Sequence, residues 1–128
     1  MNIGDVEDLA PRFGHGESQE ARFPWRELGA EQTGFAHIRV KPGRRQPFAH
    51  LHHRAEEIYV VLSGSGTLTV DGETVPLAPM DAVRIGPGAT RGMEAGPDGL
   101  EILAFGPHVE GDAEILPGWP GPEGEAGG

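Results

Sequence analysis

The chain has 128 residues, the length of one domain that can bury a genuine core. It carries 10 Lys and Arg against 20 Asp and Glu, and this net charge of −10 argues against binding to nucleic acid or to an anionic membrane surface. It has no cysteine, no apolar run near the roughly 20 residues that span a bilayer, and no signal-peptide pattern in its first residues, MNIGDVEDLA. We therefore expect a cytoplasmic protein that binds neither nucleic acid nor membrane.

The N-terminal part of the chain shows no long helical periodicity. We expect residues 1–30 to form an extension that packs on the main domain or on a partner subunit. Within it, PWREL (24–28) fits either a helical turn or a short strand.

The next part of the chain, residues 31–116, is divided into short apolar runs by pairs and clusters of Gly, Pro and Asp. Short apolar runs separated by turn-forming residues are typical of an all-β domain. Eight strands are expected, at residues 34–40, 48–52, 57–63, 66–70, 73–77, 81–85, 90–94 and 100–105. Asp71-Gly72 is the two-residue signal of a hairpin, because a type I′ turn needs positive φ at both positions. Eight such strands predict a sandwich or a small barrel.

Two of these strands carry further information about their faces. In the first, GFAHIRV, the apolar residues Ala36, Ile38 and Val40 alternate with His37, so we expect His37 to face away from the core. In the run IYVVL (58–62) both faces are apolar, whereas a strand with one solvated face would alternate. The second face is therefore expected to be covered by the N-terminal extension or by a second copy, and we favour a homodimer.

Residues 50–57, HLHHRAEE, contain a candidate metal site. His50 and His52 are two apart in a strand and share a face, and Glu57 opens the next strand with the parity of the apolar Tyr59. Two imidazoles and one carboxylate are a ligand set for Fe, Mn, Zn or Ni. By the same parity, His53 and Glu56 face outward. A partly solvated strand end that is rich in histidine, with no metal, is the alternative.

Two longer motifs resemble those of the cupin superfamily. GRRQPFAHLHHRAEEIYVVLSG (43–64) resembles the first motif, with its H-x-H, a glutamate and a closing glycine; PMDAVRIGPGATRGMEA (79–95) resembles the second. The resemblance implies an all-β, cupin-type double-stranded β-helix, that is, a single-domain jelly-roll barrel. Such barrels are often dimeric, with a metal inside. It also implies that His50, His52 and Glu57 are the metal ligands.

The second motif departs from the family pattern at one decisive position, where Arg91 replaces the histidine that supplies the last metal ligand. A guanidinium is always charged and has no lone pair for a metal. About 5 Å from a divalent ion, it would repel that ion by several kcal/mol at an effective dielectric constant of about 20.

Two functional hypotheses follow from this departure, beside a third possibility in which the polar cluster only satisfies its own hydrogen bonds in a barrel of structural role. In the first, His50, His52 and Glu57 hold a divalent metal, and Arg91 at the barrel mouth binds an anionic group of a small substrate. The resemblance then permits a dioxygenase or an isomerase. In the second, Arg91 points inward, pairs with Glu57 and forms the pocket of a metal-free binding module. In both, the walls of the ligand pocket are expected to include Tyr59, Phe48 and Met93. The last part of the chain, residues 117–128, is rich in Gly and Pro and is expected to be a flexible tail, with Trp119 as its one large ring.

Overall fold

The computed structural model describes residues 1–117; the expected tail from residue 118 onward, including Trp119, lies outside the described residues. Its strands are β1 Gln19–Arg22, β2 Thr33–Val40, β3 Ala49–His52, β4 Glu57–Val70, β5 Glu73–Leu77, β6 Ala82–Ile85, β7 Arg91–Pro107 and β8 Ala113–Leu116. Short helical turns occur at Ile3–Asp5, at Ala10–Phe13 and in α1, Trp25–Leu28. In this part of the chain no helix is both long and apolar enough to cross a membrane.

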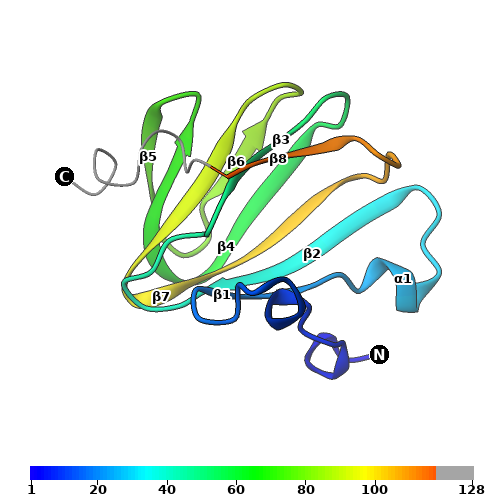
Figure 1. Ribbon diagram of the computed structural model, residues 1–128, viewed down its shortest axis with the longest axis horizontal. Coiled ribbons are helices and arrows are strands. Elements are labelled where there is room, and N and C mark those ends of the chain that lie inside the picture. Colours follow the sequence, from blue (N-terminus) through cyan, green and yellow to red (C-terminus); the bar gives the residue numbers. More distant parts are fainter. Residues whose placement is uncertain (118–128) are drawn as a thin grey trace.

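Two long strands, β4 and β7, organise the fold (Figure 1). They pair antiparallel along most of their length. The first half of β4 pairs with β6, and the second half of β7 pairs with β2. β1 pairs with the other edge of β2. The second half of β4 pairs with β5, and the first residue of β7 pairs with β3. β8 pairs with the other edge of β3. The chain thus forms two curved antiparallel layers joined by strands that run from one layer into the other, which is the predicted all-β jelly-roll barrel.

The glycine clusters that we expected to end strands are instead bends within β4 and β7. The pairing register shifts between Gly64 and Gly66, where β7 carries the four residues 96–99 between its paired positions. A Cβ on Gly66 would overlap the carbonyl oxygen of Glu94, and Gly64 has a φ of +79°. The backbones approach so closely here that only glycine fits. The four strands expected at 57–63, 66–70, 90–94 and 100–105 are therefore two long, bent ones.

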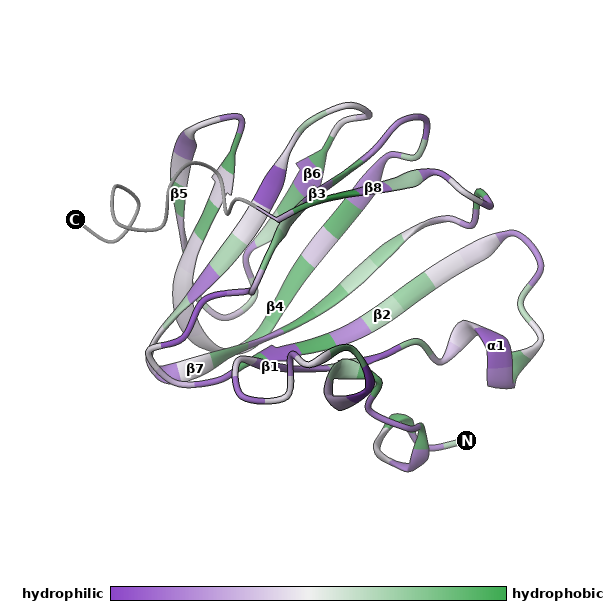
Figure 2. Ribbon diagram, viewed as in Figure 1, coloured by the Kyte–Doolittle hydropathy of each residue, from purple (hydrophilic) through white to green (hydrophobic). Residues whose placement is uncertain are grey.

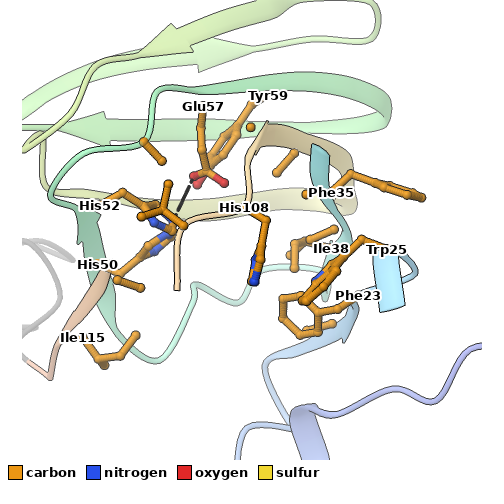
Figure 3. A pocket seen from close by; sticks show the side chains of 18 of the residues that line it. Phe23, Trp25, Phe35, Ile38, His50, His52, Glu57, Tyr59, His108 and Ile115 are labelled. Carbon is orange, nitrogen blue, oxygen red and sulfur yellow. Dashed lines mark ion pairs between the residues drawn. The ribbon is translucent and has the colours of Figure 1, made fainter. Parts of the chain in front are cut away.

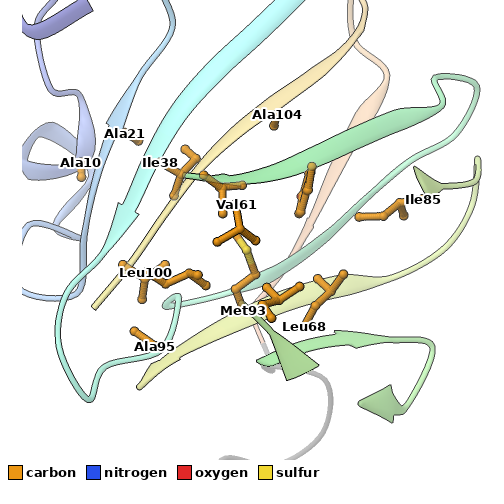
Figure 4. Packing of buried hydrophobic residues seen from close by; sticks show 14 residues of the cluster. Ala10, Ala21, Ile38, Val61, Leu68, Ile85, Met93, Ala95, Leu100 and Ala104 are labelled. Carbon is orange, nitrogen blue, oxygen red and sulfur yellow. The ribbon is translucent and has the colours of Figure 1, made fainter. Parts of the chain in front are cut away.

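The hydrophobic core lies between the two layers (Figure 4). Val61, Met93 and Leu68 are almost completely buried at its centre. Ile38 and Val40 belong to the same cluster, which confirms the predicted core face of β2. Hydrophobic residues follow β4 and β7 along the middle of the barrel, whereas α1 is largely hydrophilic (Figure 2).

The N-terminal 30 residues supply one strand of the barrel and one residue of its core. β1 adds a strand beside β2, and Ala10 joins the core cluster. PWREL forms the helical turn α1. Asp71 and Gly72 have φ angles of 47° and 84° and connect the paired strands β4 and β5, so the predicted hairpin is confirmed.

The second apolar face of β4 is not covered within the described residues. Ile58 and Leu62 keep 43% and 42% of their surface exposed. Val60 lies between them on the same face and is half-buried. The N-terminal segment packs against β1 instead (Figure 1).

Candidate metal site and ligand pocket

The end of β3 and the start of β4 bring together the three residues that the sequence singled out. His50 and His52 project from β3, Glu57 projects from the first position of β4, and the three side chains point toward one another (Figure 3). The Nε2 atoms of His50 and His52 lie 3.9 and 3.5 Å from Oε1 of Glu57. One donor atom from each residue lies within 4.8 Å of the other two.

This spacing fits a divalent metal ion. With metal–ligand bonds of about 2.1 Å in a tetrahedral site, neighbouring donor atoms are about 3.4 Å apart. The two histidine–glutamate distances are close to that value. Two imidazoles and a carboxylate also match a common donor set of divalent transition metals. Composition and geometry therefore agree on the same three residues.

A carboxylate that sequence reasoning missed lies beside one of the histidines. Asp112 lies in the turn before β8, and its Oδ2 atom is 3.6 Å from Nδ1 of His52. Asp112 is held in turn by the backbone N–H groups of Arg54 and Ala55, which donate to it at 2.9 Å. Its contact with Nδ1 leaves Nε2 of His52 directed at Glu57, an arrangement typical of metal-binding histidines. Burial lowers the pKa of His52, against the opposing effect of Glu57, and so favours the neutral ring.

Arg91 points inward and pairs with Glu57. It lies opposite His50 in the pairing of β3 with β7. Its Nη2 donates to Oε1 of Glu57 at 2.5 Å, and Nη1 donates to the carbonyl of Ala89 at 2.9 Å. Burial alone would raise the pKa of Glu57, but the nearby ring of His50 and the hydrogen bond and charge of Arg91 lower it to about 2. Glu57 is therefore a carboxylate at any ordinary pH.

This position of Arg91 is at odds with the expectation that it reaches the barrel mouth to bind an anion. Its side chain has no exposed surface, and Arg91 does not line the pocket. The physical reason is local: a buried guanidinium needs a carboxylate partner, and Glu57 is within reach. The pair has two opposing effects on a metal. Arg91 fixes Glu57 in its ionised form, but it occupies the oxygen nearest both histidines and adds a positive charge.

The three residues line one part of a cavity of about 350 Å³ inside the barrel (Figure 3). Tyr59, Phe48 and Met93, which we expected to form its walls, all line it. Sequence reasoning missed much of the rest. Trp25 and His108 also line the cavity, and their rings lie 4.0 Å apart. They come from α1 and from the segment after β7, which no local pattern connects.

The neighbouring polar residues lie outside the cavity, as their parity predicts. His53 is exposed and contacts Glu114, and Glu56 is exposed and pairs with Arg84. His37 faces away from the pocket, where its Nε2 lies 2.7 Å from Oε2 of Glu101. None of these residues can reach the three candidate ligands.

Comparison with known proteins agrees with the fold. A family model described as "Cupin domain" matches residues 36–104. The chain is 32% identical over 80 residues to "Uncharacterized protein MJ1618" of Methanocaldococcus jannaschii, in a match that covers 60% of this chain and 64% of that protein. The chain thus spans less than two thirds of this relative's length.

Two solved structures with a similar fold belong to proteins with different names. One is named "Putative sugar phosphate isomerase", from Acidithiobacillus ferrooxidans, with 30% identity and a TM-score of 0.65 over 75% of this chain and 64% of that chain. The other is the polyketide cyclase RemF from Streptomyces resistomycificus, with 22% identity and a TM-score of 0.72 over 91% of this chain and 82% of that chain. With the family match over more than half of its length, the chain belongs to the cupin family.

Proposed function

We propose that this protein is a metal-dependent cupin that holds one divalent transition metal ion on His50, His52 and Glu57 and takes a small molecule into the adjoining cavity. The observation that carries the proposal is the convergence of three donor atoms within 4.8 Å at the wall of a cavity of about 350 Å³. A cavity of this size is typical of small-molecule sites.

The surrounding residues would each support that site. Asp112 keeps His52 turned so that Nε2 faces the cavity. Arg91 keeps Glu57 ionised and fixed in place from behind. Tyr59 and Met93 exclude water from the inner wall, because both are at most 3% exposed.

A metal ion with only three protein ligands supplies open coordination positions and polarises an oxygen atom bound there. This chemistry is compatible with an isomerase or with a dioxygenase. The similarity to the Acidithiobacillus protein supports the isomerase class, since that protein is named as one.

One specific observation favours a second function. The short contact between Arg91 and Glu57 satisfies the carboxylate without any metal. In that case the barrel is a binding module, and the two histidines serve as polar groups of its pocket. The choice between the two functions depends on whether a metal binds in the presence of Arg91.

Metal analysis of protein prepared without a histidine tag separates the two functions. We expect about one equivalent of metal after incubation with Fe, Mn, Zn or Ni salts and removal of excess ion, and loss of that metal in His52→Ala. His53→Ala is the matched control, because His53 is the adjacent histidine and its exposed side chain contacts Glu114 instead of the site. Failure to retain any of the four ions would favour the binding module. Equal metal loss in His52→Ala and His53→Ala would place the metal elsewhere.

A further inference from the structure

The cavity walls contain no cation. Among the described residues that line it, Glu57 is the only carboxylate, three are histidines and none is lysine or arginine. Arg91, the partner of Glu57, is fully buried and pairs with Glu57 and with the carbonyl of Ala89. The chain as a whole carries a net charge of −10.

These charges disfavour an anionic ligand. A phosphate or carboxylate group is normally bound by arginine, lysine or several backbone N–H groups, and an unpaired anion in an apolar cavity carries a high desolvation cost. In the metal-free protein, a sugar phosphate would place a doubly charged group against described walls that offer it no lysine or arginine. Binding of an anionic substrate by Arg91 at the barrel mouth therefore loses its structural basis.

The walls are instead rich in aromatic rings that come from separate elements. Phe23 and Trp25 lie on one side (Figure 3), and Phe48 directly precedes β3. Trp25 packs against the exposed His108, with 4.0 Å between ring centroids and 32° between ring planes. Aromatic side chains arranged around a cavity pack well against another flat ring.

The polar groups of the cavity are few and uncharged apart from the candidate metal site. Gln19 and Gln46 line it and are 4% and 6% exposed. Gln46 donates to Oε1 of Gln19 at 3.0 Å and accepts from the backbone N–H of Met93 at 3.1 Å, so its amide is fixed. A ligand thus meets amide groups at one wall, histidines at another and apolar rings elsewhere.

From this arrangement we propose that the ligand is an uncharged, planar aromatic molecule that carries a hydroxyl or carbonyl oxygen. Its ring lies among Trp25, Phe23 and Phe48, and its oxygen faces His50 and His52. This inference rests on the proposed function in that it uses the same cavity, and it names the substrate class. Binding of the ring depends on the aromatic walls and needs no metal.

Calorimetric titration of the metal-stripped protein with 2-naphthol tests the inference, with glucose 6-phosphate as the charged comparison. We expect saturable binding of about one equivalent of 2-naphthol and no saturable binding of the sugar phosphate. Trp25→Ala and His108→Ala should each weaken 2-naphthol binding by about tenfold, as expected from losing an aromatic partner. His108 is exposed in a loop, so its variant keeps the fold even if Trp25→Ala does not.

Phe13→Ala is the control, because Phe13 is an exposed aromatic residue that does not line this cavity. Binding in this variant should match that of the unmodified protein. Saturable binding of glucose 6-phosphate without 2-naphthol binding would overturn the inference, and so would equal 2-naphthol affinities in the Phe13→Ala, Trp25→Ala and His108→Ala variants. Because the protein is metal-free in this titration, 2-naphthol binding without any metal affinity would refute only the metal site.

Discussion

Arg91 determines more of this site's chemistry than any other residue. It stands where the family pattern has a ligand, yet it lies buried behind Glu57 and donates hydrogen bonds to that carboxylate and to the carbonyl of Ala89. A buried ion pair often contributes little net stability, but removing one partner is costly because the other charge is left unpaired. Arg91 therefore has two separable effects, one on the metal-free fold and one on metal affinity.

Replacing Arg91 should separate these effects. In Arg91→Met the unpaired Glu57 should lower the free energy of unfolding of the metal-free protein by about 3 kcal/mol. The same change removes the repelling charge, so affinity for Zn²⁺ or Ni²⁺ should rise by about tenfold or more. Arg91→His should bind more tightly still, because it adds a fourth ligand. Metal titrations and denaturation of both variants with and without metal measure the two effects.

Arg84→Met is the control for charge removal, since Arg84 is an exposed arginine that pairs with Glu56 away from the cavity. Its metal affinity should equal that of the unmodified protein. Negligible metal binding in Arg91→His would show that His50, His52 and Glu57 do not act together as ligands.

At the scale of single elements, the sequence predicts those side-chain directions that depend only on residues close together in the chain. The parity of His50, His52 and Glu57 depends only on two adjacent strands, and the structure places all three at the cavity wall. The direction of Arg91 depends on the pairing of β3 with β7, about 40 residues apart in the chain, and the sequence left it open.

Two strands were missed for a similar reason. β1 (QEAR) and β8 (AEIL) are short and have no strong alternation of their own. Each forms because a partner strand, β2 or β3, offers an edge. With β8 comes the turn that positions Asp112, so this contact to His52 could not be predicted either.

The glycine bends of β4 and β7 allow a direct test. In Gly66→Ala the new methyl group would overlap the backbone carbonyl of Glu94, which cannot move without breaking the pairing of the two strands. We expect a loss of roughly 3 kcal/mol in the free energy of unfolding, the range of strongly overpacked sites. Urea denaturation of the two proteins measures this loss.

Gly86→Ala is the matched control. A Cβ at Gly86 would meet only the flexible end of the Arg84 side chain, at 3.7 Å, and its backbone is not in the left-handed region. Its stability should change by less than about 0.5 kcal/mol. Similar stabilities for the Gly66→Ala and Gly86→Ala variants would mean that the two strands do not cross as closely as described.

At the scale of the whole molecule, the outer face of β4 and β7 exposes apolar side chains that nothing in the described part of the chain covers. Ile58 and Leu62 are exposed there, and the register places Phe105 beside Ile58 and Leu103 beside Val60. Arg84 and Glu56 form an ion pair with each other beside Ile58. A contiguous exposed apolar patch is the kind of surface that a two-fold interface between identical chains buries.

We therefore keep the prediction of a homodimer and assign it to this face. Light scattering during size-exclusion chromatography should give about twice the chain mass of 13.6 kDa. Leu62→Glu places a charge at the apolar centre and should give the monomer mass, because burying an unpaired carboxylate is costly. Met80→Glu adds the same charge at a position that is 83% exposed on the β5–β6 turn, and it should remain dimeric. A monomeric unmodified protein, or a Leu62→Glu variant that stays dimeric, would exclude this interface.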